Sequence, residues 1–361
     1  MSGKSAARNG PSFAVVLTSM LFTPFRRAAV SRGFFLLGAG AMLFPARAAE
    51  LSAPSSLVVP LPVAPVLESD ESNVEAPLPT FSRQIRASKP NFAPRAVPAT
   101  RSTNYLAPPP DGFYQTPFEL QNWLLDLSQI RPSQVKTRVL GRTPGGRALI
   151  ALEITPPGVP TAKLRRLVVL CRQHGNEPEA SASGARFIRE FLTSKDPKKQ
   201  RIARRTALLI VPIANPDGAA VYRRRTDAKI DMNRDWGRQK SPEVRLLARW
   251  IVASKPHLVV DVHQWLPGEH QHQPMAEASG GIVARQTAQR MARNSARRGY
   301  VLAARSRWGL DTLCHRYWGQ RFKIPAILLE SRHRPTVPGA REVAIGTSLT
   351  ALWSAAETIA K

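Results

Sequence analysis

Apolar residues are spaced in two ways along the chain from about residue 116 onward. Short apolar runs, as at 167–171 and 258–262, are typical of buried strands, whereas apolar residues recurring every three or four positions, as after Pro178, indicate helices. The strands expected on this basis lie at 135–140, 148–154, 167–171, 207–212, 258–262 and 326–329, and the helices at about 116–127, 178–192, 242–253, 282–296 and 340–359, the last amphipathic. Strands that alternate with helices predict an α/β fold with a mixed, largely parallel central sheet flanked by helices.

The start of the folded part carries a helix signal. Thr116, Pro117 and Glu119 form a capping box with proline at the first helical position. We therefore expect one folded domain over residues 113–361.

Residues 1–48 have the composition of an export signal. Arg26 and Arg27 precede an apolar run at 34–44, and Ala46-Arg47-Ala48 follows as a cleavage pattern, so the mature chain should begin near Ala49. The run is too short to leave a stable membrane span. The arginine pair leaves the general and twin-arginine export routes open, and Met20 is an alternative translation start. These features predict a periplasmic or secreted bacterial protein.

Residues 49–112 are rich in proline. Twelve of the 32 prolines fall between positions 51 and 112, and no periodic apolar pattern accompanies them. Such a composition favours a solvated, disordered linker. A pro-segment that covers the active site is the alternative.

The chain is strongly basic, with 52 Lys and Arg against 25 Asp and Glu and a net charge of +27. This charge favours anionic partners, although a generally arginine-rich proteome would also produce it. Since no basic motif is interleaved with aromatic residues, no nucleic-acid partner is expected. Cys171 and Cys314 permit one disulfide, and a buried free thiol is at least as compatible with the apolar run around Cys171.

Candidate metal ligands lie where predicted strands end. His174 and Glu177 occupy the turn between the strand at 167–171 and the helix that begins at Pro178. Imidazole nitrogen and carboxylate oxygen both bind zinc, but a catalytic zinc needs three protein ligands, and His-x-x-Glu alone is usually a surface turn. His263 follows the apolar run at 258–262, and Glu330 follows the run at 325–329, where a carboxylate is costly to bury without a partner.

Three further motifs lie between these positions. They are Asn215-Pro216-Asp217-Gly218, Arg223-Arg224-Arg225 and Asp231-Met232-Asn233-Arg234. Separately they read as a turn, a solvated charge run and a loop. In this order, and together with His174, Glu177, His263 and Glu330, they resemble the zinc carboxypeptidase family, which includes pancreatic carboxypeptidase A and bacterial murein-peptide amidases. The resemblance covers roughly residue 111 to the C-terminus.

The resemblance implies a metal centre with one zinc ion per chain. His174, Glu177 and His263 would be its ligands, and Asp231 would orient His174. Glu330 would be the general base that deprotonates a zinc-bound water and then the acid that protonates the leaving amine.

The resemblance also implies a substrate-binding group. Arg225 would stabilise the oxyanion, and it is preferred to Arg223 and Arg224 because its distance along the chain to Asn233 fits best. Asn233 and Arg234 would bind a free carboxylate beside the scissile bond.

Two features depart from the family pattern. Asp235 and Trp236 stand where many relatives have Asn-Phe. The family's mobile tyrosine has no clear counterpart, and neither Tyr300 nor Tyr317 is assigned to it.

His270 and His272 form an extra His-x-His that could bind a second metal, although a solvated loop is the simpler interpretation.

These inferences predict an exported zinc metallocarboxypeptidase that hydrolyses an amide bond next to a residue with a free carboxylate. The expected partner is a peptide, in particular a cell-wall muropeptide. One alternative is a zinc amidohydrolase that deacylates N-acyl amino acids. Another is a catalytically inactive module that binds peptidoglycan or another polyanion. Side-chain specificity and oligomeric state stay open.

Overall fold

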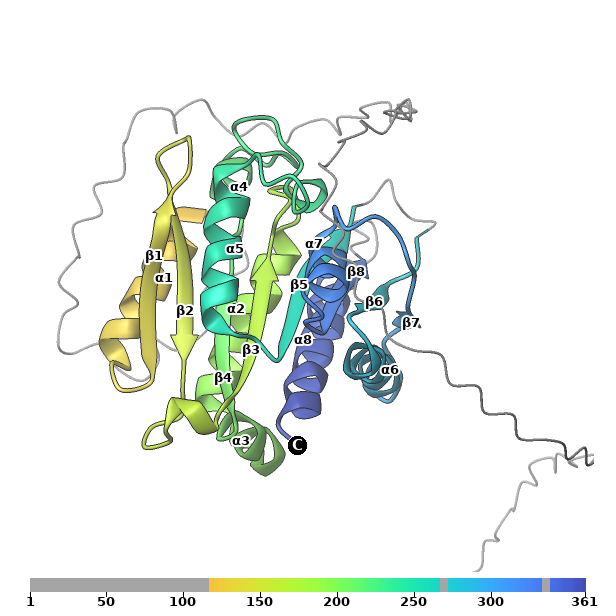
Figure 1. Cartoon of the computed structure of the whole chain (residues 1–361). Helices are drawn as coiled ribbons and strands as arrows, with labels where there is room; N and C mark the ends of the chain where they lie inside the picture. Colours follow the sequence, from red (N-terminus) through yellow and green to blue (C-terminus); the bar gives the residue numbers. More distant parts are fainter. Residues whose placement is uncertain (1–116, 267–271, 333–337) are drawn as a thin grey trace, which may run out of the picture. The chain divides into compact units, whose positions relative to one another are not determined.

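The structure is a computed structural model that describes residues 117–266, 272–332 and 338–361 (Figure 1). The predicted export signal, the proline-rich linker and the predicted domain start at residue 113 lie outside these residues. The described strands are β1 (Val135–Arg142), β2 (Ala148–Ile154), β3 (Arg165–Cys171), β4 (Thr206–Val211), β5 (Leu258–Trp265), β6 (Met275–Ser279), β7 (Ala303–Arg305) and β8 (Ala326–Arg332). They form one sheet in the order β1-β2-β4-β3-β5-β8-β6-β7.

The four central strands are parallel, and an antiparallel pair joins them to the strands on each side. Strands β4, β3, β5 and β8 run parallel to one another, whereas β2 pairs with β4, and β6 pairs with β8, in antiparallel register. The central strands are apolar on both faces, as strands covered on both sides must be. The predicted α/β fold with a mixed, largely parallel sheet is confirmed.

Helices cover both faces of the sheet (Figure 1). The longer helices and the short ones near the site are α1 (Pro117–Ile130), α2 (Pro178–Thr193), α3 (Pro197–Ala203), α4 (Pro216–Ala220), α5 (Pro242–Ser254), α6 (Ile282–Ala296), α7 (Cys314–Arg316) and α8 (Ala340–Ile359), and a π-helical turn spans Tyr317–Arg321. One apolar core joins the sheet to α1, α2, α6 and α8, and the other joins it to α5, α7 and the π-helical turn. The second face is the one that carries the candidate site.

Three sequence-based expectations need correction. Helix α8 is not amphipathic, because it packs against α2 and α6 as well as the sheet and is buried on most of its circumference. His263 and Glu330 lie inside β5 and β8 rather than after them, since both strands continue past the apolar run that predicted them. Strands β6 and β7 were not predicted, because β6 carries polar residues among its apolar ones and β7 has only three residues.

Two findings concern single features of the chain. Pro117 is the first residue of α1, as expected, while the capping residue Thr116 lies outside the described residues. In the described part of the chain no helix has both the length and the apolarity that crossing a bilayer requires.

Candidate metal centre and active site

The turn that carries His174 and Glu177 is held by the Asn-Pro-Asp-Gly motif. Asn215 accepts a hydrogen bond from the Gly218 amide at 2.8 Å and donates its side-chain amide to the Gln173 carbonyl at 3.2 Å. Gly175 packs so closely on this motif that an added Cβ would lie 2.1 Å from the Gly218 carbonyl carbon. Only glycine fits at position 175, because the backbone of the motif leaves no room for a side chain there. The motif therefore holds the turn in place.

Asp217 of the same motif ties this region to the β1–β2 hairpin. Its carboxylate accepts hydrogen bonds from the Thr143 hydroxyl at 2.8 Å, the Gly145 amide at 2.9 Å and the Arg147 guanidinium at 2.9 Å. Asn215 and Asp217 thus act as structural supports of the site, and the sequence had shown them only as a turn.

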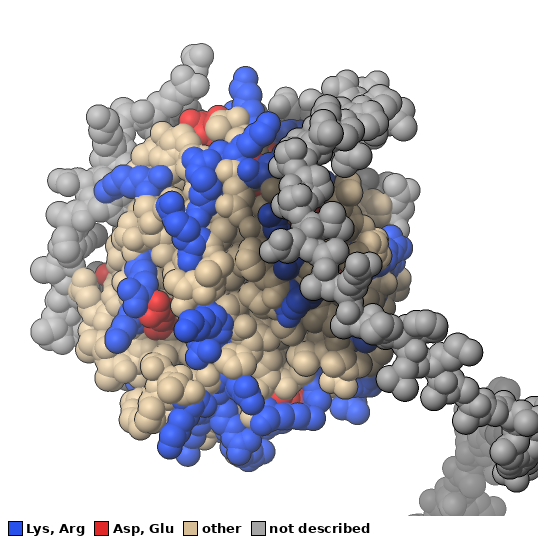
Figure 2. Space-filling view, viewed as in Figure 1, with Lys and Arg blue, Asp and Glu red and all other residues tan. Residues whose placement is uncertain are grey.

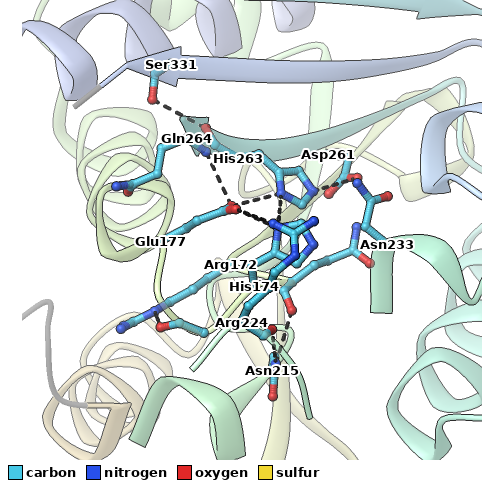
Figure 3. A network of polar contacts seen from close by, with 12 residues as sticks. Arg172, His174, Glu177, Asn215, Arg224, Asn233, Asp261, His263, Gln264 and Ser331 are labelled. Atoms are coloured by element: carbon cyan, nitrogen blue, oxygen red, sulfur yellow. Dashed lines mark hydrogen bonds and ion pairs between the residues drawn. The ribbon is translucent and has the colours of Figure 1, made fainter. Parts of the chain in front are cut away.

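Three candidate ligands converge in the interior (Figure 3). His174 Nδ1 lies 2.5 Å from Glu177 Oε1, His263 Nδ1 lies 2.8 Å from Glu177 Oε2, and the two Nδ1 atoms are 3.1 Å apart. All three side chains are at most 3% exposed. Two imidazole nitrogens and one carboxylate that face a common point form the donor set of a catalytic zinc site. The arrangement is a possible metal site, and its donors fit zinc.

Each histidine has an acidic partner on its outward nitrogen. His174 Nε2 hydrogen-bonds Asp231 Oδ1 at 3.1 Å. His263 Nε2 lies 3.0 Å from Asp261 Oδ2 (Figure 3). A carboxylate on Nε2 favours the tautomer with the proton there and leaves the Nδ1 lone pair for a metal. Asp231 was expected beside His174. Asp261 was missed, although an acid inside the apolar run of β5 is itself a signal.

The charges of the site reflect these contacts. Burial alone would raise the pKa of Glu177, but His174 and His263 outweigh it and hold that pKa below its usual range. Burial likewise acts against a charged His263, yet Asp261 and Glu177 raise the pKa of the imidazole well above its usual value. For Asp231, the hydrogen bond from His174 overcomes burial and lowers the pKa of the carboxyl. The cluster is thus built to neutralise positive charge at its centre.

Glu330 lies next to the cluster. It is the in-register neighbour of His263 across the parallel pair β5–β8, and it is 6% exposed. Paired residues on neighbouring strands lie about 5 Å apart and point to the same face. A buried carboxylate therefore stands directly beside the candidate metal ligands.

The structure brings Arg224, and not Arg225, to this cluster. Arg224 Nε donates to Asp231 Oδ2 at 3.0 Å, and its Nη1 lies 3.9 Å from Glu177 Oε1. Arg225 is exposed and its guanidinium donates to the Lys229 carbonyl at 3.3 Å. The chain spacing that favoured Arg225 carried no information on side-chain direction.

The two expected carboxylate-binding residues lie on one short helical turn, Met232–Arg234. Asn233 is buried, and its side-chain oxygen accepts the Cys314 amide at 3.1 Å, which leaves its NH₂ group for other partners. Arg234 is exposed.

Other candidate residues lie elsewhere. Tyr300 packs against Gly346 of α8, and buried Tyr317 shares a hydrogen bond of 2.6 Å with Gln239. The ring of His272 stacks on Trp265 with centroids 4.7 Å apart, and His270 lies outside the described residues. Both cysteines are buried and free, which confirms the free-thiol interpretation.

Comparison of the sequence with known proteins finds similarity to carboxypeptidases. The family model described as zinc carboxypeptidase matches residues 120–265. The chain is 32% identical to cytosolic carboxypeptidase 2 of Danio rerio over 124 residues, which are 33% of this chain and 17% of that protein. It is 26% identical to carboxypeptidase D of Drosophila melanogaster over 179 residues, which are 40% of this chain and 12% of that protein. The chain thus spans less than a fifth of the length of these two curated relatives.

Solved structures share the fold. A metallo-carboxypeptidase from Burkholderia cenocepacia superposes with a TM-score of 0.54 at 21% identity, over 66% of this chain and 69% of that chain. Carboxypeptidase A from Helicoverpa armigera gives a TM-score of 0.54 at 14% identity, over 68% of this chain and 74% of that chain. At these identities the likeness shows the fold alone. The zinc carboxypeptidase family model covers β1 to β5, so over this part the chain is similar to zinc carboxypeptidases in sequence as well as in fold.

Proposed function

We propose that this chain is a zinc-dependent carboxypeptidase that hydrolyses the amide bond next to a residue with a free carboxylate. The observation that carries the proposal is the convergence of His174 Nδ1, Glu177 and His263 Nδ1 on one buried point. A zinc ion held by these three ligands would polarise the scissile carbonyl and lower the pKa of an attacking water toward about 7.

Glu330 has the position of the proton carrier. Its carboxylate is buried next to His263, so it can take the proton of the attacking water and pass it to the leaving amine. A module that only binds ligands has no need of a buried carboxylate there. Glu330 therefore favours an enzyme over an inactive binding module.

Arg224 replaces Arg225 as the proposed oxyanion partner. It is held toward the cluster by Asp231 and comes within 3.9 Å of Glu177. A fixed guanidinium next to the reacting carbonyl stabilises the negative charge that develops on its oxygen.

Asn233 and Arg234 are the proposed substrate anchors. The NH₂ group of Asn233 and the exposed guanidinium of Arg234 can together bind a terminal carboxylate. Such an anchor makes the enzyme an exopeptidase, because a peptide bond inside a chain has no free carboxylate beside it.

We further propose that the enzyme is exported and acts on cell-wall muropeptides. Residues 1–48 support export by composition. Figure 2 shows Lys and Arg across the visible face, with few acidic groups, and a basic surface favours an anionic substrate. The same proposal includes a catalytic domain of residues 113–361 that follows a proline-rich linker of residues 49–112.

Metal analysis of the purified protein tests the centre. One zinc per chain is expected, lost in His174→Ala and in His263→Ala, because each change leaves two ligands where catalytic zinc uses three. His272→Ala is the matched control, since His272 stacks on Trp265. Zinc that survives His263→Ala but is lost in His272→Ala would refute the proposed ligand set.

A further inference from the structure

A hollow lies at the opposite end of the strands from the metal centre. Strands β6 and β7 are parallel to each other and antiparallel to β8, with Met275 opposite Glu330 and Ser279 opposite Ala326. The carboxyl ends of β6 and β7 therefore point away from the metal centre, and four residues of strand separate the two places by about 13 Å. At these carboxyl ends the surface encloses a hollow of about 580 Å³, which begins at Ser279 and Ser306.

The hollow stands at the kind of position where α/β sheets bind ligands. Strand β6, helix α6 and strand β7 form a crossover unit, and ligands of such sheets bind outside the carboxyl ends of parallel strands. The turn from β6 to α6 is Gly280-Gly281, with φ angles of 90° and 97°. An added Cβ at Gly280 would lie 2.6 Å from the Ile324 carbonyl oxygen, so bare main chain forms this wall.

The residues that line the hollow include three positively charged side chains and no acidic one. Arg285, Arg307 and Lys323 line the hollow, all three are exposed, and no acidic residue shares the lining. Among the residues that the structure describes, none of the three forms an ion pair. Three cations from separate segments that face one hollow favour an anionic group, and guanidinium donors suit phosphate oxygens.

The other residues that line the hollow are suited to bind a sugar ring. Trp308 lines the hollow and is 86% exposed, which makes it the most exposed of the large apolar side chains in the described part of the chain. Its flat face can stack on the apolar face of a sugar. Ser279, Ser306 and Gln320 offer hydroxyl and amide groups for the hydroxyls of that sugar. The volume lies in the range of small-molecule sites.

We propose that this hollow is a binding site for a sugar phosphate. The phosphate contacts Arg285, Arg307 and Lys323, and the sugar ring lies on Trp308. The site is separate from the metal centre and does not depend on the proposed peptidase activity.

Calorimetric titration of the full-length protein with ribose 5-phosphate, inorganic phosphate and ribose tests this site. Ribose 5-phosphate should bind in a saturable manner and more tightly than either fragment. Arg285→Gln/Lys323→Gln should weaken ribose 5-phosphate and inorganic phosphate by at least about tenfold, since it removes two charge-assisted contacts. Arg285→Lys, which keeps the charge, should retain most of the affinity.

The control separates a built site from the attraction of a basic chain. Arg201→Gln/Arg204→Gln removes the same charge from exposed positions near α3 and should change either affinity by less than about twofold. Trp308→Ala should weaken ribose 5-phosphate and leave inorganic phosphate unchanged. Equal losses in the two double variants would overturn the proposal, as would an unchanged preference for ribose 5-phosphate in Trp308→Ala. All the substituted residues are exposed, and unchanged thermal midpoints confirm that the variants fold.

Discussion

Replacing Asp261 by Asn should weaken zinc binding without removing a ligand. Asp261 and His263 lie two residues apart on β5, so their side chains share a face, and Oδ2 lies 3.0 Å from Nε2. Both residues have no exposed surface. The carboxylate fixes the imidazole ring and increases the electron density at Nδ1, the atom that faces Glu177.

The size of the effect follows from what the substitution removes. Asn keeps the shape and one acceptor oxygen but loses the negative charge that Asp261 places 3.0 Å from His263 Nε2. Loss of such a partner of a ligating histidine typically costs about 10–100-fold in metal affinity. That range corresponds to about 1.4–2.8 kcal/mol of zinc-binding free energy.

The assay is competition for zinc between the protein and a chelator of known affinity. Asp227→Asn is the matched control, because it makes the same chemical change on an exposed residue and should leave the zinc dissociation constant unchanged. If Asp261→Asn binds zinc as tightly as the wild type, Asp261 does not position His263 and the reasoning fails.

Three further outcomes are expected. Arg224→Gln should lower kcat by about 10²–10³-fold, the usual cost of losing one oxyanion donor, whereas Arg225→Gln should leave kcat unchanged; the opposite pattern would restore Arg225. Arg234→Ala should mainly raise KM, because it removes a contact made equally in the ground state and the transition state, and steady-state kinetics would contradict this if kcat alone fell. The third outcome concerns acid stability. Although burial raises it, the pKa of Glu277 is lowered to about 2 by His315 and neighbouring groups. Its stabilisation is therefore complete above about pH 4.5 and is lost as the pH falls toward 2, so urea unfolding should show the difference in stability between wild type and Glu277→Gln shrinking by at most about 3 kcal/mol over that interval. A difference that stays constant with pH would contradict the assignment.

The buried helices and strands could be predicted from the sequence, because their buried positions are apolar and recur with the period of a helix or a strand. Strand Ala148–Ile154 and helices Ile282–Ala296 and Ala340–Ile359 lie where the apolar pattern places them. The prediction that Ala340–Ile359 is amphipathic was wrong, since its small and hydroxyl residues are packed between neighbouring helices. Short side chains at close helix contacts resemble an exposed face in a sequence.

The candidate site was only partly predictable, for a different reason. The order of the motifs identified the residues that converge, including His174, Glu177 and His263. It did not tell Arg224 from Arg225, because neighbouring residues in a loop point in directions that the loop's own hydrogen bonds decide.

The measurement that tests the central claim most directly is release of the C-terminal residue from paired peptides, one with a free and one with an amidated C-terminus, by the zinc-loaded full-length protein. The peptide with the free carboxylate should be cleaved and the amidated one should not. Glu330→Gln should keep its zinc and its affinity for the free peptide while kcat falls by about two to four orders of magnitude. A muropeptide cleaved faster than an ordinary peptide would support the proposed substrate, and release of an acyl group from N-acyl amino acids instead would favour an amidohydrolase. Equal cleavage of the free and amidated peptides, or an unchanged kcat in Glu330→Gln, would contradict the account.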